Sequence, residues 1–383
     1  MLKRMTVTVT TEAFAPATGI ANNTVQVPCS RAQLVGFALT AGRPWRLSGG
    51  LVGWASWGPA PANLAAFVAN EALELGGLIH LLLSYLEQPA GGPVSGTEYL
   101  HLLEKTEMGQ AAARLGNGMT ALLAWQVLGV LALHHVADAG PGVLVPPPGP
   151  ATQRPDFFGR PGPGMPYSTF EAKGTAGGAF SAAKKEAAKV QATAFTAIAG
   201  APVGFCTACF GQFPAAPAMV AGTMVDPQVP TDGDELPADL VGRRELERYG
   251  PVGRAIAAGR PTVTLPAQDA LEQAVELFPM GTAGFFGAVA PVANRIRAVL
   301  DTDPSDLSAA EVGEEFETAR AGITDRRLPP VLPGSAGEGH RGGGVAGGDD
   351  AEARLTEING VWCELVVLPD GLVLALRQEI IDG

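Results

Sequence analysis

The chain has 383 residues, enough for two or three domains, and its hydrophobic content of 46% is ample for a sizeable core. Its 50 glycines and 32 prolines follow no period, which excludes a collagen-like structure, and no Gly-x-x-x-x-Gly-Lys motif is present, which excludes P-loop nucleotide hydrolysis. The formal net charge of −12 lacks the strongly basic signature of typical nucleic-acid-binding domains, and four cysteines fit a reducing compartment.

Residues 1–93 form the first predicted region, an N-terminal α/β extension. Alternating Thr and Val at Thr6–Thr10 and a short apolar run at Val25–Val27 predict strands, and the apolar stretch Ala62–Leu86 predicts a helix. The N-terminus lacks the apolar core of a signal peptide, so a cytoplasmic location is expected. The helix is long enough to span a membrane, but its two glutamates and its histidine favour a buried core helix, and no membrane partner is expected.

Residues 94–230 are expected to form a second α/β unit. The apolar-rich stretch Thr106–Val136 is spaced mainly by three and four, as for a buried helix face. Turn-forming Gly and Pro separate the short apolar runs that follow it. The expected elements are strands at Gly142–Val145, Gln153–Gly159 and Tyr167–Lys173, a helix at Phe180–Ile198 and a strand at Val203–Phe210.

Two carboxylates and a lysine in this segment have the spacing that metal-dependent phosphodiester hydrolysis requires. Asp156 lies on the second expected strand, and Glu171 and Lys173 lie on the third. Residues i and i+2 of a strand face the same side, so Glu171 and Lys173 should converge on one site. One or two carboxylates are the usual protein ligands of Mg²⁺, and a lysine can orient water or stabilise charge on phosphate.

This pattern resembles the PD-(D/E)xK, or restriction-endonuclease-like, nuclease superfamily over Glu98–Pro230. The resemblance implies an αβββαβ core within a larger α+β protein and Mg²⁺ or Mn²⁺ as the cofactor. It implies that Asp156 and Glu171 bind the metal, that the Ala172 carbonyl adds a ligand, and that Lys173 is catalytic. Some branches add an acid from the first helix, for which Glu107 is the preferred residue, with Glu104 in reserve.

Basic residues gather around the motif although the whole chain is acidic. Four of the six lysines fall between Lys173 and Lys189, in a chain whose basic residues are mostly arginine. A basic rim around an acidic metal site is what a nuclease needs to neutralise phosphates. Nucleic acid, with DNA favoured over RNA, is therefore the expected partner, bound by Arg154, Arg160, Lys184, Lys185, Lys189 and Gln191.

Three interpretations of the motif remain open. The first is an active nuclease in defence, restriction or repair. The second is a catalytically inactive nuclease fold that binds nucleic acid or a protein partner through the same basic rim. The third is a chance match in a structural or assembly protein, since short motifs carry a false-positive risk.

Other reactive side chains favour structural interpretations. Cys206 and Cys209 form a Cys-x-x-Cys motif, but residues i and i+3 of a strand face opposite sides, so buried cysteines are favoured over a zinc or redox site. His134 and His135 could approach a substrate phosphate, but capping the end of the first core helix is favoured.

The C-terminal part divides into three predicted regions. Residues 231–332 are expected to be mainly helical, with the clearest helices at Ala267–Phe278 and Ala309–Ala321. Residues 333–350 are rich in Gly and Pro and predict a flexible linker. Residues 351–383 predict a β-hairpin around Pro369-Asp370-Gly371, which is too small to hold a core alone and should dock on the main body or on another chain, including a second copy.

Overall fold

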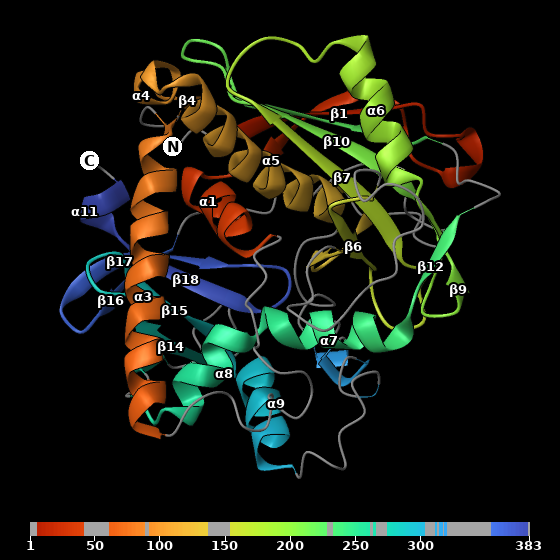
Figure 1. Ribbon diagram of the computed structural model, residues 1–383. Coiled ribbons are helices and arrows are strands. Elements are labelled where there is room, and N and C mark those ends of the chain that lie inside the picture. Colours follow the sequence, from red (N-terminus) through yellow and green to blue (C-terminus); the bar gives the residue numbers. More distant parts are fainter. Residues whose placement is uncertain are drawn as a thin grey trace, which may run out of the picture.

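The structure is a computed structural model with a mixed α/β architecture built around two large sheets (Figure 1). The predicted mixture of helices and strands is confirmed at this level. The structure describes residues 6–41, 61–88, 92–136, 154–227, 233–260, 263–265, 274–302, 311, 314–316, 318–319 and 354–381.

Seven strands form the first sheet, in the order β2-β1-β11-β10-β7-β6-β5. β1 pairs with β11 and β7 pairs with β10 in parallel, and the other neighbours are antiparallel. The N-terminal strands thus extend the sheet that contains the expected nuclease motif. The strands are β1 (Thr6–Glu12), β2 (Thr24–Pro28), β5 (His134–His135), β6 (Phe157–Gly159), β7 (Ser168–Thr175), β10 (Cys206–Gln212) and β11 (Ala221–Val225).

Two helices cover opposite faces of this sheet. α5 (Lys105–Leu128) packs on the face that carries Phe170, and α6 (Ala182–Ala192) packs on the face that carries Phe210. α5 approaches β7 so closely that a Cβ at Gly174 would lie 1.7 Å from the Ala112 carbonyl oxygen. This contact requires glycine and leaves the α5 face of β7 no room for a ligand.

Six antiparallel strands form the second sheet, in the order β13-β14-β15-β18-β17-β16. α3 packs against α8, and α8 and α9 pack against β15. These elements are β13 (Val263–Leu265), β14 (Val275–Pro279), β15 (Gly284–Val289), β16 (Arg354–Ile358), β17 (Val361–Val367), β18 (Leu372–Arg377), α3 (Pro61–Ser84), α8 (Gly250–Ala257), α9 (Ala290–Asp301) and the terminal α11 (Gln378–Ile381).

Short elements complete the described chain. β3 (Leu86–Glu87) pairs with β4 (Ser95–Gly96), and β8 (Phe195–Ile198) lies between β9 (Ala201–Pro202) and β12 (Asp234–Leu236). The remaining helices are the 3-10 turn η1 (Pro16–Thr18), α1 (Arg31–Thr40), α4 (Glu98–Leu102) and α7 (Ala238–Arg248).

α1 joins the two sheets into one packed body. One side of α1 packs on α5, and the other side places Gly36 against Leu368 and Leu374 of the second sheet. One continuous apolar core includes residues of both sheets. At the end of α1, the buried Arg248 guanidinium donates to the carbonyls of Thr40 and Leu133, each at 3.1 Å, and contacts the Asp370 carboxylate.

Several expected helices end early or are strands. The helix expected to reach Val136 stops at Leu128, where Gly129 adopts a φ of 68°, and His134 and His135 form β5 instead of a helix cap. The second expected helix ends at Ala192, and its last residues form β8, which is rich in aromatic and β-branched side chains.

The C-terminal expectations also need correction. Val275–Pro279, expected in a helix, forms β14, because buried Val275, Leu277 and Phe278 pack in the second sheet. Residues 231–332 therefore contain strands as well as helices. The predicted hairpin at residues 351–383 is present as β17 and β18 but belongs to the six-stranded sheet. The expected strand at Gly142–Val145 and linker at 333–350 lie outside the described residues.

Among the described helices, α3 is long and apolar enough, from Leu64 to Ser84, to cross a membrane by length and composition alone. In the structure, its Glu71 forms an ion pair with Arg254 of α8. A Cβ at Gly76 would lie 2.8 Å from the Met280 carbonyl oxygen, so α3 also packs closely against the second sheet. The expected absence of a membrane partner stays a prediction.

Candidate active site on strands β6 and β7

Asp156 and Glu171 lie next to each other where β6 begins. Phe157 pairs with Phe170 in the antiparallel register, and continuing that register by one residue places Asp156 opposite Glu171. The Asp156 carboxylate accepts a hydrogen bond from the Ala172 backbone N–H at 2.9 Å. The pairing of β6 with β7 thus brings both carboxylates to one point of the sheet.

Glu171 is the most unusual residue of this site, because its carboxylate is 1% exposed. Its Oε1 contacts the Lys173 ammonium group, which is partly exposed. Its Oε2 has no hydrogen-bond partner among the described residues. A buried carboxylate oxygen without a donor costs free energy, and a bound cation would remove that cost.

The environment of Glu171 favours its protonated form. Burial raises the pKa of Glu171 to about 8, and the neighbouring Asp156 charge adds to the rise. Contact with Lys173 and a hydrogen bond with the Asp156 backbone lower the pKa of Glu171 but do not offset burial. At neutral pH and without a cation, the Glu171 carboxyl therefore retains its proton in the folded protein.

Replacing Glu171 by glutamine should stabilise the metal-free protein at high pH. Between pH 4.5 and about 8, the folded state holds a proton that the unfolded chain has released, so stability falls as pH rises through this window. The loss of folding free energy is on the order of 5 kcal/mol and is complete above the folded pKa. We expect the melting temperature of Glu171→Gln to exceed that of wild type by several degrees at pH 9, and by less at pH 4. An equal difference at both pH values would contradict this prediction.

The Ala172 carbonyl points to the β6 side of β7, the side on which Asp156 lies. Thr169 donates its backbone N–H to Phe205 on the β10 side, whereas Ala172 donates its own N–H to Asp156 on the β6 side. The N–H and C=O of one residue point to the same side of a strand, so the Ala172 carbonyl also points to the β6 side. Asp156, Glu171 and this carbonyl are therefore the oxygen ligands that the site could offer a cation.

The donor set suits Mg²⁺ or Mn²⁺ better than zinc. Hard divalent cations take oxygen ligands and keep several waters, so one or two carboxylates suffice. No group of three or more His, Cys, Asp or Glu side chains suited to a metal occurs in the described part of the chain. The Glu171 Oε2, which has no partner among the residues that the structure describes, and the neighbouring Asp156 fit a site with only two carboxylate ligands.

The expected acids of the first helix lie apart from this pair. Glu107 is exposed in the first turn of α5, on the helix that covers the opposite face of β7. Burial raises the pKa of Tyr85, and the Glu107 charge contributes to that rise, so Glu107 lies near the phenol of Tyr85. Glu104 accepts a hydrogen bond from the Thr106 N–H at 2.9 Å and caps α5.

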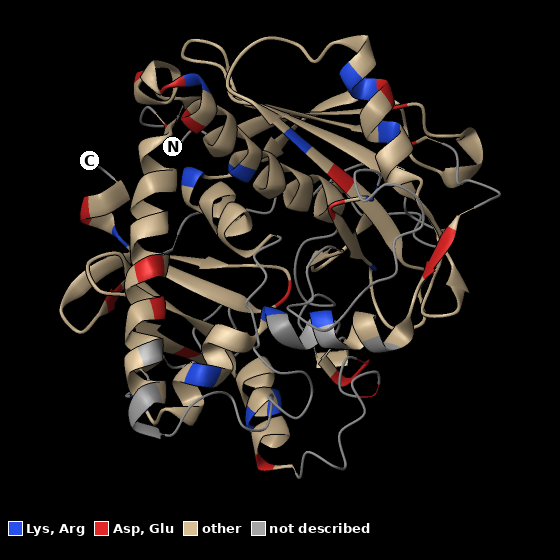
Figure 2. Cartoon of the chain, viewed as in Figure 1, with Lys and Arg blue, Asp and Glu red and all other residues tan. Residues whose placement is uncertain are grey.

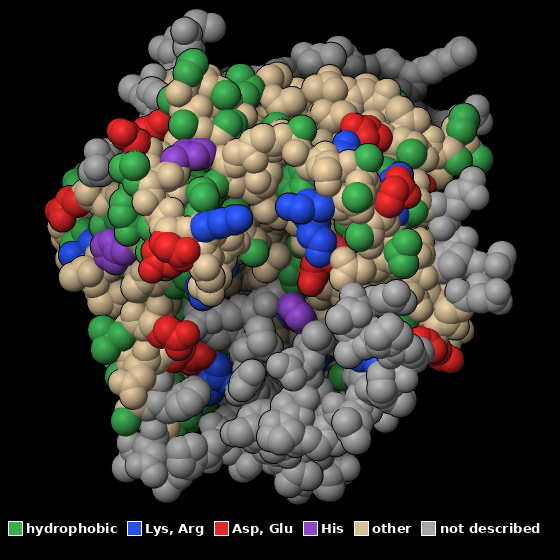
Figure 3. All heavy atoms as spheres, turned by 45° about the horizontal axis from the view of Figure 1, so that its top comes forward, with side chains coloured by type: hydrophobic (Ala, Val, Ile, Leu, Met, Phe, Trp, Pro, Cys, Tyr) green, Lys and Arg blue, Asp and Glu red, His purple; other side chains and the backbone are tan. Residues whose placement is uncertain are grey.

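The expected basic rim is only partly available for phosphate. Lys189 Nζ lies 2.7 Å from Glu186, and Lys185 Nζ lies 3.6 Å from Glu12. Figure 2 shows an acidic position beside a basic one on β7 and several basic positions on α6, and Figure 3 shows acidic and basic side chains interspersed on one face. The other expected residues are exposed Lys184 and half-buried Arg154, Arg160 and Gln191.

The cysteines and histidines have structural surroundings. All four cysteines are buried and unbonded, and Cys206 and Cys209 lie in different apolar clusters on opposite faces of the sheet, as expected. The His134 ring pairs with the backbone carbonyl of Arg244 at 3.3 Å, and the His135 ring packs edge-on against Phe157. The described cysteine and histidine contacts thus fit core packing.

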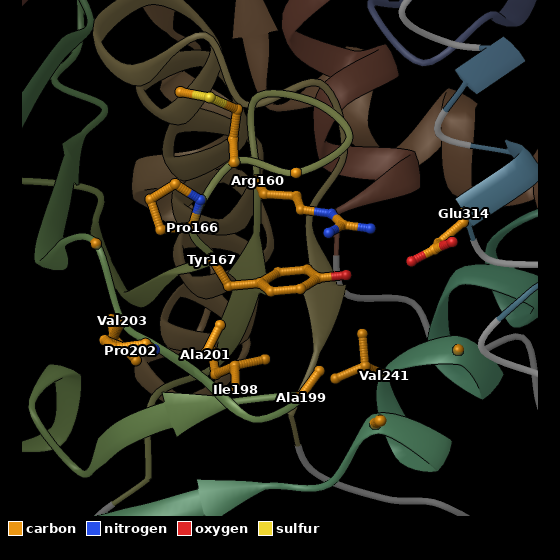
Figure 4. Close-up of a pocket in the computed structure, with 15 residues that line it drawn as sticks. Arg160, Pro166, Tyr167, Ile198, Ala199, Ala201, Pro202, Val203, Val241 and Glu314 are labelled. Carbon is orange, nitrogen blue, oxygen red and sulfur yellow. The ribbon is translucent and has the colours of Figure 1, made fainter.

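A pocket of about 640 Å³ lies at the start of β7, away from the carboxylates. Tyr167 and Glu314 line it (Figure 4), and neither had a role in the sequence analysis. Tyr167 lies four residues before Glu171. Because side chains alternate along a strand, this spacing alone predicts that both lie on the same face of β7. Glu314 is distant in sequence, so no local pattern could have indicated it.

Comparison with protein-family models, curated proteins and solved structures finds no match for this chain.

Proposed function

We propose that this chain is a nuclease of the PD-(D/E)xK type that uses Mg²⁺ or Mn²⁺, with DNA as its favoured substrate. The observation that carries the proposal is the buried Glu171 carboxylate, whose Oε2 has no hydrogen-bond partner among the described residues. Asp156 lies opposite Glu171 in the sheet, and Lys173 follows it two residues later on the same strand. A buried carboxylate whose ionisation is made more costly by a neighbouring carboxylate is rarely retained for stability alone. A divalent cation would offset that cost.

The order of elements around the motif supports this proposal. α5, the antiparallel strands β5, β6 and β7, then α6 and the parallel strand β10 follow one another as in the superfamily core. The short strands β8 and β9 are an addition between α6 and β10. Asp156 precedes the second strand of this set, and Glu171 and Lys173 lie on the third.

In the proposed mechanism, Asp156, Glu171 and the Ala172 carbonyl would hold the cation, and the Lys173 ammonium would act on the phosphate. A bound Mg²⁺ or Mn²⁺ would supply Lewis acidity toward the phosphodiester. Lys173 is partly exposed, so its amine can leave the Glu171 contact and donate to a phosphate oxygen or to the attacking water. Glu171 must lose its proton for the site to hold a cation.

The net negative charge of the chain would weaken its binding to nucleic acid. Of the basic residues that the sequence places around the motif, Lys185 and Lys189 already contact carboxylates. Binding to phosphates would therefore be weak, and because few phosphates would be neutralised, it would depend only modestly on salt. The same observation favours the second candidate function, an inactive nuclease fold that binds a protein partner or a second copy of the chain.

A cleavage assay with a Lys173→Ala variant tests the proposal. Plasmid and single-stranded DNA are incubated with Mg²⁺ or Mn²⁺ and the wild-type protein, with Lys173→Ala, or with Lys105→Ala as a control for loss of one surface lysine, all purified identically. We expect a 100- to 1,000-fold loss for Lys173→Ala, on the order of the effect of removing one donor from a transition state, and none for Lys105→Ala. Equal cleavage by all three would refute the proposed role of Lys173, and no cleavage by any would favour the inactive fold.

A further inference from the structure

The N-terminal strands β1 and β2 extend the sheet of the candidate active site by a partly exposed polar surface. Thr10 of β1 lies beside Thr223 of β11, which lies beside Phe210 of β10, so these three side chains share the face on which α6 packs. α6 packs on β7 and β10 of this face. The residues of β1 that point to the opposite face are buried, whereas its threonines are partly exposed.

The strand registers align the side chains of this face in rows that run across β7, β10, β11, β1 and β2. The first row contains Glu171 of β7 and Glu12 of β1, and the second contains Lys173 of β7 and Thr10 of β1. Consecutive rows are roughly 6.6 Å apart along the strands. The third row consists of Thr175, Gln212, Ala221, Thr8 and Gln26, all at least partly exposed.

The second and third rows, together called the polar face, offer uncharged hydrogen-bonding groups. Apart from Lys173, the polar face carries no charged side chain on these five described strands, although the chain has 38 acidic residues. The hydroxyl oxygens of Thr10 and Thr24 lie 3.0 Å apart. One hydroxyl hydrogen joins this pair, so the other can be donated to a ligand. Threonine and glutamine side chains are among the usual partners of nucleic-acid phosphates and sugars.

We propose that the polar face binds the backbone of a nucleic-acid strand that extends from the candidate active site. The strand's path to that site rests on the nuclease proposed above, in which Lys173 acts on phosphate. A phosphate backbone fits this surface because the polar face is continuous with Lys173 and contains no carboxylate to repel it. From Lys173 to Thr24 the second row spans four strand spacings, roughly 19 Å, the length of about six stacked nucleotides.

Binding of a labelled single-stranded 12-nucleotide DNA to the full chain, measured by fluorescence anisotropy in EDTA, tests the proposal without cleavage. The double variant Thr10→Val/Thr24→Val removes two hydroxyls but keeps β-branched residues that favour strands. We expect Kd to rise roughly 2- to 10-fold, as for loss of one hydrogen bond, and its salt dependence to stay the same because no charge is removed. Thr264→Val/Thr356→Val, on β13 and β16 of the second sheet, is the matched control and should bind as wild type does. Equal binding by both double variants, or no binding by wild type, would overturn the inference.

The variant Thr24→Lys tests the polar face by a gain of affinity, which misfolding could not produce. Thr24 is exposed on the edge strand β2, so a lysine there can reach a phosphate of the bound strand. We expect tighter binding and a salt dependence of log Kd steeper by about one unit of slope. Thr264→Lys, at an exposed position of β13, should change neither quantity. Equal gains from the two lysines would indicate general attraction of phosphate and would overturn the inference.

The two proposals fail separately. Binding that depends on Thr10 and Thr24, in a chain that cuts no DNA with Mg²⁺ or Mn²⁺, refutes the nuclease but keeps the polar face as a nucleic-acid surface. Cleavage whose KM for DNA is the same in wild type, Thr10→Val/Thr24→Val and Thr24→Lys refutes the polar face only.

Discussion

Replacing Glu171 by glutamine is expected to lower metal-dependent DNA cleavage at least about 100-fold while the protein stays folded. Glutamine has nearly the same shape and can keep a contact with Lys173, but it is a neutral and weak ligand for a hard divalent cation. Above a pH of about 8, the variant also removes the cost of burying an ionised carboxylate whose Oε2 has no partner among the described residues. Loss of activity should therefore coincide with a gain in stability, as is common where a site is kept for function.

Cleavage rates and thermal unfolding of the same preparations measure this prediction. Glu357→Gln, a matched change of an exposed glutamate on β16, should alter neither quantity. Unchanged cleavage by Glu171→Gln would place the chemistry elsewhere. A large loss of stability at pH 9 would contradict the assigned environment of Glu171.

Replacing Asp370 by alanine is expected to lower the free energy of unfolding by about 3 to 5 kcal/mol. Asp370 is fully buried and is paired with Arg248, which is also buried. Without Asp370, the guanidinium would remain in the interior as an uncompensated charge. Hydrogen bonds to the Thr40 and Leu133 carbonyls hold the Arg248 guanidinium where α1 and the segment before β5 meet the β17–β18 turn. Loss of Asp370 should therefore destabilise the packing of both sheets.

Chemical denaturation followed by circular dichroism measures this effect. Asp301→Ala, at the exposed end of α9, is the matched control and should stay within about 0.5 kcal/mol of wild type. Adding Arg248→Met to Asp370→Ala should cost less than the sum of the two single changes, because the partners share one interaction. A loss below about 1 kcal/mol for Asp370→Ala would show that the pair does not hold the sheets together.

The proximity of Asp156 and Glu171 was predictable because it depends on local geometry. A turn-forming break of Gly and Pro between two short strands predicts a hairpin, and the period of two directs Glu171 and Lys173 to one side. The structure brings all three residues together. The chemical roles of these residues stay predictions. Their positions could be predicted from the alternation of side chains along a strand and from the turn between the two strands.

The burial of Glu171 was not predictable, since it depends on contacts between distant segments. Its neighbour across the sheet is Ala208 on β10, and α6 covers the same face. Likewise, no local pattern shows that Lys185 contacts Glu12 or that Glu314 lines the same pocket as Arg160 and Tyr167. Val275–Pro279 was misassigned because a short apolar run fits a helix or a strand equally well until its sheet partners are known.

Titration of the wild-type protein with Mn²⁺ by calorimetry, at pH 6.5 and at pH 9, tests most directly whether Asp156 and Glu171 form a metal site. Because Glu171, with a pKa of about 8, must release a proton before it binds the cation, we expect binding at both pH values and a Kd at least about tenfold lower at pH 9. Glu171→Gln should bind weakly and equally at the two pH values. Absence of heat at pH 9, or wild-type binding that Glu171→Gln leaves unchanged, would contradict the metal site.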